Sequence, residues 1–151
     1  MGNFIHNDGG RAAAGFKGSA GDCVTRAIAI AAGLDYQYVY DAMAAGNAEQ
    51  RQTKHSRRKK SCGRRTANHG IWTTRKWFKD WMKQHGFVWV TCMTIGSGCK
   101  VHLRPEDLPM GRIIVRVTRH YCAVIDHIIH DTYDCSREGT RCVYGYWRFA
   151  G

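Results

Sequence analysis

The sequence predicts a single α+β domain in which helices come first and an antiparallel sheet follows. The chain has 151 residues, of which 44% are hydrophobic, and this is enough to bury one sizeable core. Apolar residues over 23–46 and 71–84 recur with helical spacing, whereas those between 87 and 149 alternate as in strands. Helices followed by a run of strands are typical of the α+β class.

The first helix is predicted from Cys23 to about Ala32. Residues 1–22 are rich in Gly and Ala and are expected to form an extended lead-in. Asp22 is a favourable N-cap residue, and Gly33 is a natural residue to end the helix. The helix is apolar on almost every side, so we expect it to be buried centrally.

Two further helices are expected before the sheet. Asp35 is positioned to cap a second helix over residues 36–46, which would form a hairpin with the first. Residues 46–69 have no sustained apolar pattern and are interpreted as a mobile basic loop. A third helix is predicted over residues 71–84, where aromatic side chains lie near helical spacing.

The second half of the chain has the period of strands. A helical turn with proline at its start is expected at "RPEDLP". The strands are predicted over residues 87–93, 112–118, 121–126, 127–131 and 141–149.

The positive charge is concentrated in one segment. The formal net charge is +11, and residues 51–65 carry eight Lys or Arg and no acid. Elsewhere the 15 remaining basic residues outnumber the 12 acidic ones by only three. Such a run is either a solvated loop or a surface for phosphates or another acidic partner, and it lacks the aromatic residues that stack on bases. The candidate binding residues are Arg57, Arg58, Lys59, Lys60, Arg64 and Arg65.

The cysteines are predicted to be reduced thiols rather than a disulfide framework. Their number is odd, their spacing is irregular, and no signal peptide or membrane-spanning segment is expected, which favours a cytoplasmic location. The C-x2-H spacing of "CKVH" has no second close pair, so we expect no metal and no cofactor. The seven are Cys23, Cys62, Cys92, Cys99, Cys122, Cys135 and Cys142.

One cysteine, one histidine and one aspartate form a candidate catalytic set. Cys23 begins a helix, where the positive end of the helix dipole favours a thiolate, although a free cysteine can equally be a buried packing residue. A tight hairpin between strands 121–126 and 127–131 would make His120 and Asp131 neighbours across the strands. His120 would then face Asp131 with one ring nitrogen and Cys23 with the other. Asp134 is an alternative partner for the imidazole.

This order of residues resembles the papain-like cysteine peptidases. The segment "HYCAVIDHIIHDTYD" and the later "YGYW" resemble the histidine and asparagine segments of that family. The chain as a whole is similar to a group of small uncharacterised phage and bacterial proteins. These share GDCVxRAIAIA, IGSGCxVHLRxxELP and AVIDGxxxDTxDxSRxGTRCVYGYW.

The resemblance implies a papain-like fold and an acyl-transfer hydrolase that cleaves a peptide, isopeptide or amide bond. Cys23 would be the nucleophile, His120 the general base and acid, and Asp131 the residue that orients the imidazole. Papain-like peptidases carry a glutamine six residues before the cysteine as an oxyanion donor. This chain has Lys17 there, so Lys17 and the nearby Ser19 are the oxyanion candidates.

A different class of function fits the same fold. A catalytically inactive papain-like domain could bind nucleic acid or a host protein through the basic loop. In the catalytic alternative the partner is a protein or peptide substrate. Neither alternative involves a membrane, and a phage-encoded protein would act in the host cytoplasm.

Overall fold

The computed structural model describes residues 4–16, 22–49, 71, 73–94 and 96–150, and these form a mixed α+β fold. The helices are α1 (Cys23–Ala32), α2 (Tyr36–Glu49) and α4 (Lys76–Gln84), with a short 3₁₀ turn at Pro105–Asp107. The strands are β1 (Phe4–His6), β2 (Phe87–Thr91), β3 (Arg112–Val117), β4 (His120–Ile125), β5 (Ile128–Asp131) and β6 (Gly145–Phe149). The predicted order of helices and then strands is confirmed, apart from β1.

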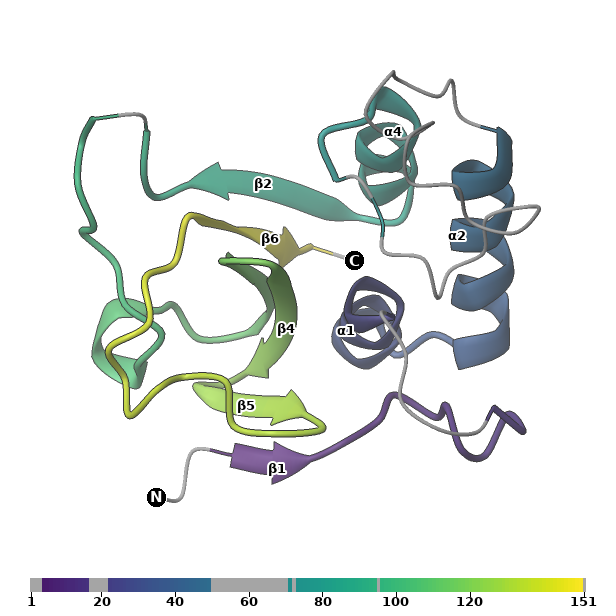
Figure 1. Cartoon of the computed structure of the whole chain (residues 1–151), viewed down its shortest axis with the longest axis horizontal. Coiled ribbons are helices and arrows are strands. Elements are labelled where there is room, and N and C mark those ends of the chain that lie inside the picture. Colours follow the sequence, from purple (N-terminus) through teal and green to yellow (C-terminus); the bar gives the residue numbers. More distant parts are fainter. Residues whose placement is uncertain (1–3, 17–21, 50–70, 72, 95, 151) are drawn as a thin grey trace.

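The six strands form one sheet in the order β1-β5-β4-β3-β6-β2 (Figure 1). All neighbouring pairs are antiparallel except β1 and β5, which are parallel. The prediction of an antiparallel sheet is therefore wrong at this edge, where part of the extended lead-in pairs as a parallel strand. A strand as short as β1 carries little sequence signal, and only the exposed edge of β5 gives it a partner.

Each face of the sheet has its own apolar core. On one face α1 lies between the sheet and the pair α2 and α4, as Figure 1 shows, and the buried residues there include Ile28, Met43, Phe78 and Ile114. The other face is covered by the irregular segments between β2 and β3 and between β5 and β6. Alternation along the strands supplies an apolar residue to both faces, which is why the central strands are buried on both sides.

The first helix has the predicted bounds. Gly33 follows it in the left-handed conformation with φ of 66°, and its N–H donates to the carbonyl of Ala29. Asp22 occupies the N-cap position, but its side chain makes no capping hydrogen bond. Asp35 does cap α2, since its carboxylate accepts a hydrogen bond of 3.2 Å from the N–H of Tyr38.

The other helix boundaries differ from the sequence prediction. The second helix continues past Gly46 to Glu49, and the ring of Trp77 occupies the place that a Cβ of that glycine would need. The third helix begins at Lys76, five residues later than predicted from the aromatic spacing. Strand β6 also begins later than predicted, at Gly145.

A disulfide joins Cys99 to Cys142, so the prediction that all cysteines are reduced is wrong for these two. An antiparallel bridge between His102 and Cys142 aligns the two irregular segments, and the Cα atoms of the cysteines lie 5.9 Å apart. This distance suits a disulfide. The free cysteines in the described part are Cys23, Cys92, Cys122 and Cys135. No helix among the described residues is long and apolar enough to cross a bilayer.

Candidate active site

The hairpin of β4 and β5 brings His120 and Asp131 together. Asp126 and His127 form its two-residue turn, and both have positive φ, as the twist of a tight hairpin requires. The register pairs Ile125 with Ile128, and continuing it makes the His120–Asp131 contact a diagonal one on the same face. The imidazole Nε2 lies 2.6 Å from the carboxylate Oδ2, and both residues are buried. The hairpin prediction is confirmed.

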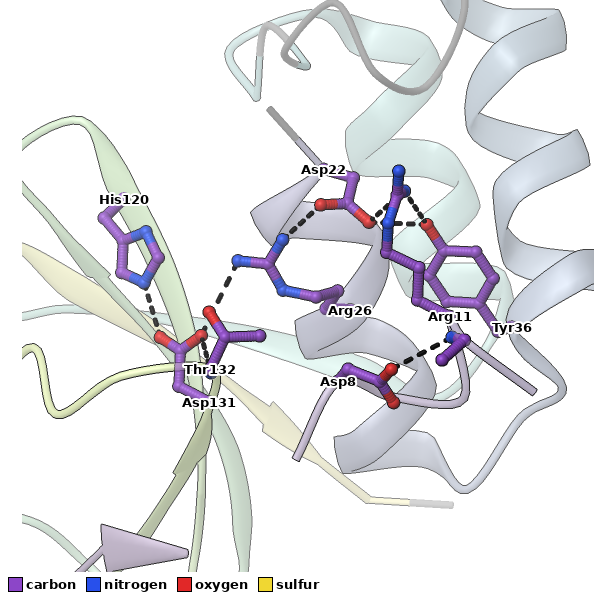
Figure 2. A network of polar contacts seen from close by, with 9 residues as sticks. Asp8, Arg11, Asp22, Arg26, Tyr36, His120, Asp131 and Thr132 are labelled. Atoms are coloured by element: carbon purple, nitrogen blue, oxygen red, sulfur yellow. Dashed lines mark hydrogen bonds and ion pairs between the residues drawn. The ribbon is translucent and has the colours of Figure 1, made fainter. Parts of the chain in front are cut away.

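Asp131, and not Asp134, is the carboxylate against the imidazole. The second oxygen of Asp131 accepts a hydrogen bond of 2.7 Å from the N–H of Thr132. It also lies 3.6 Å from the guanidinium of Arg26. Asp134 accepts instead from the N–H of Ser136, two residues further along the chain. Asp131 is therefore held on both oxygens, which orients it toward His120 (Figure 2).

Cys23 approaches His120 from the helical side. It is the first residue of α1, its side chain is partly exposed, and α1 packs against β4. Burial lowers the pKa of His120, but its hydrogen bond with Asp131, together with those to Cys135 and Cys23, outweighs burial and raises the pKa to about 12. The imidazole is therefore held in its protonated form beside Cys23.

Asp22 serves a network of buried charges rather than a helix cap. One carboxylate oxygen accepts from Arg11 at 2.9 Å and from the hydroxyl of Tyr36 at 2.5 Å, and the other pairs with Arg26. Burial and the hydrogen bond to Asp22 raise the pKa of Tyr36.

Figure 2 shows that this network runs through Arg26 to Asp131 and His120. The carboxylate of Asp22, which precedes Cys23 in the chain, is balanced by the guanidiniums of Arg11 and Arg26. The second carboxylate reached by Arg26 is the one that orients the imidazole. The network therefore ties the start of α1 to the end of β5.

Cys135 is a further member of the site that the sequence does not single out. His120, Asp131 and Cys135 each offer one ligand atom, and these atoms lie within 4.8 Å of one another. A hydrogen bond from Cys122 is the main cause that lowers the pKa of Cys135 to about 6, and His120 adds to it against the effect of burial. Imidazole, thiolate and carboxylate are the ligands that zinc prefers, so these three residues can hold a divalent ion.

Several predicted site residues lie outside the described residues, as does most of the basic loop predicted over residues 46–69. These residues are the oxyanion candidates Lys17 and Ser19 and the basic residues Arg57, Arg58, Lys59, Lys60, Arg64 and Arg65.

The function of this chain is inferred from the arrangement of its site residues. Neither family models nor curated proteins nor solved structures give a match to this chain.

Proposed function

We propose that this chain is a cysteine-dependent acyl-transfer hydrolase of papain-like architecture that acts on a peptide, isopeptide or amide bond. The observation that carries the proposal is the buried 2.6 Å contact between His120 and Asp131, placed against Cys23 at the start of a helix. The substrate would be a protein or peptide, and a cytoplasmic site of action belongs to the same proposal.

The proposed reaction proceeds through a thioester. The thiolate of Cys23 attacks the carbonyl carbon, and the carbonyl oxygen becomes an oxyanion. The imidazolium of His120 then gives its proton to the leaving amine as the carbon–nitrogen bond breaks. A water molecule loses a proton to His120, attacks the thioester and releases the acid and the thiolate. Asp131 keeps the imidazole in the correct orientation and stabilises its charged form.

The start of α1 supports stabilisation of the oxyanion. The first N–H groups of a helix have no acceptor within the helix, and in α1 the first backbone bond is from Arg26 to Asp22. The N–H of Cys23 itself is therefore a candidate donor. Removal of one such donor typically costs on the order of 10²–10³ in rate.

Cys23 rather than Cys135 is proposed as the nucleophile because a substrate must reach the sulfur. Cys135 also interacts with His120, and its pKa is lowered to about 6. Its relative exposure is only 1%, however, whereas Cys23 is partly exposed. A buried thiolate beside the imidazole adjusts the charge of the site but does not meet a polymer substrate.

The test is the pH dependence of alkylation by iodoacetamide, measured at each cysteine by peptide mapping. A thiol with a pKa of ~8.5 gains on the order of 100-fold in thiolate between pH 6 and 8.5. Cys92 is the internal reference, since burial raises its pKa. We expect the labelling rate of Cys23 to change less than about threefold over this range.

Two histidine variants give the matched comparison. His120→Ala should restore a steep pH dependence at Cys23, whereas His127→Ala should leave it flat because the ring of His127 bonds the carbonyl of Leu108, outside the site. A steep profile at Cys23 in the wild-type protein would overturn the proposal. It would instead favour a catalytically inactive domain that binds a partner.

A further inference from the structure

A pocket of about 540 Å³ opens beside His120. One wall is the turn between β3 and β4, which carries Arg119, and the other is the segment after β5, which carries Tyr133, Asp134 and Arg137. The ring of Tyr133 lies 5.3 Å from the imidazole of His120 and is half exposed. The pocket therefore leads from solvent to the candidate general base.

Three arginines face this pocket against one acid. Arg119 and Arg137 are exposed, and among the described residues neither side chain has a hydrogen-bond or ion-pair partner. Arg141 donates to the carbonyls of Cys135 at 3.3 Å and of Thr118 at 2.5 Å. It thereby links the two walls without losing its charge, because carbonyl groups do not neutralise it.

The backbone at two of these arginines is unfavourable for a side chain. Arg119 has φ of 56° and Arg137 has φ of 52°, in the left-handed region that Gly or Asn normally occupies. An ordinary residue there costs on the order of 1–2 kcal/mol. Arginine in two such turns on the rim of one pocket points to a use for the side chains.

The positive charge belongs to this pocket and not to its neighbour. A larger cavity of about 780 Å³ shares Asp134 with it but does not include His120. Besides Asp134, the lining of the larger cavity contains two acids, Glu106 and Glu138, and one arginine, Arg104. The two cavities are thus opposite in charge, with the basic one next to the imidazole.

We propose that the basic pocket binds a carboxylate of the substrate, from an acidic side chain or a chain terminus close to the bond that is cleaved. Guanidinium groups match the two oxygens of a carboxylate in geometry and charge. The proposal rests on the proposed function, because it assigns a substrate class to that site. Arg119 and Arg137 are the residues that would meet the carboxylate.

The test compares two alkylating agents of similar size at Cys23. Iodoacetate carries a carboxylate and iodoacetamide does not, so the ratio of their rates reports attraction for the anion. Relative to the same ratio for glutathione, we expect about a threefold to tenfold increase at low ionic strength, and a smaller one in 0.5 M NaCl. Arg119→Gln and Arg137→Gln should each lower the ratio, and the double variant should lower it further than either single change, although Arg141 and the imidazolium remain.

Two controls keep the test decisive. Arg148 is also exposed but pairs in register with Ile113, at the opposite end of β3 from Arg119, so Arg148→Gln should leave the ratio unchanged. Arg119→Gly removes the charge and relieves the backbone, so it should lower the ratio without loss of stability. A wild-type ratio equal to that of glutathione, or an equal fall in Arg148→Gln, would overturn the proposal.

Both reagents alkylate the same thiol, so the ratio of their rates does not depend on the intrinsic reactivity of that thiol. If the ratio equals that of glutathione while the labelling rate of Cys23 does not change with pH, the carboxylate pocket is contradicted and the proposed nucleophile is not. A steep pH profile at Cys23 with a raised ratio would contradict the proposed nucleophile and leave the anion pocket standing.

Discussion

Substitution of Asp22 by asparagine tests the buried charge network at its centre. Asp22 is 1% exposed, and Arg11 and Arg26, whose guanidiniums contact it, are 7% and 8% exposed. Asparagine at this position would keep the shape of the side chain and lose its charge. Arg26 would retain Asp131 at 3.6 Å, whereas Arg11 would lose the carboxylate that it contacts at 2.9 Å.

The expected cost follows from the burial of these charges. Removal of one partner from a buried ion pair typically costs about 3–5 kcal/mol. Domains of this size are stable by about 5–15 kcal/mol, so Asp22→Asn should remove a large part of the stability. The free energy of unfolding is measured by urea denaturation, with the slope of the transition as a check on two-state behaviour.

A surface ion pair in the same chain gives the matched control. Lys76 and Asp80 lie 2.5 Å apart on α4, with side chains 87% and 43% exposed. Asp80→Asn removes the same charge and should cost less than about 1 kcal/mol, because water solvates the lysine that remains. If the two variants lose equal free energy of unfolding, or if Asp22→Asn loses less than about 1 kcal/mol, burial does not make the Asp22 network important for stability.

Three further predictions concern the site and the packing. The raised pKa of His120 adds stability that is complete below pH ~6.5 and declines above it, whereas the lowered pKa of Cys135 adds stability that is complete above pH ~9 and is lost as the pH falls through about 6. The two effects oppose each other, so urea denaturation should show a nearly constant wild-type stability between pH 6.5 and 8.5, and a fall of up to ~1.4 kcal/mol per pH unit in Cys135→Ser. Zinc should slow alkylation of Cys23 reversibly, as followed by peptide mapping before and after chelation. Cys135→Ser should weaken this effect, and equal inhibition of the wild-type protein and the variant would argue against Cys135 as a ligand. Gly46→Ala should lower the thermal midpoint even though alanine favours helices, because a Cβ there would overlap the ring of Trp77; an unchanged or higher midpoint would show that the ring can move aside.

The elements that sequence patterns predict well are those with strong local signals. The bounds of α1 follow from an apolar run that ends at Gly33, and the β4–β5 turn follows from two short alternating runs around Asp126 and His127. The edge strand β1 and the disulfide between Cys99 and Cys142 are not predicted by any local pattern. Both depend on segments that are far apart in the chain, and neither segment carries a periodic pattern.

In the candidate site, too, local contacts are predictable from the sequence and contacts between distant segments are not. The contact of His120 with Asp131 is predictable because a tight hairpin brings residues eleven apart to the same face. Asp22 is the N-cap residue as predicted, but its side chain does not cap the helix, because its carboxylate bonds Arg11 and Tyr36 from other segments. Cys135 lies only four residues beyond Asp131, but a lone cysteine in a loop gives no signal of its neighbours.

The helix that carries Cys23 and the hairpin that joins His120 to Asp131 are predictable from local sequence patterns. Capping, hydrophobic periodicity and turn geometry act over a few residues, and they can be recognised without the rest of the chain. The link from Asp22 through Arg26 to Asp131, and the three arginines around the pocket beside the imidazole, become visible in the folded structure. Burial of a charge and the meeting of distant side chains arise from the packing of whole elements, and this packing decides which polar groups must find one another away from water.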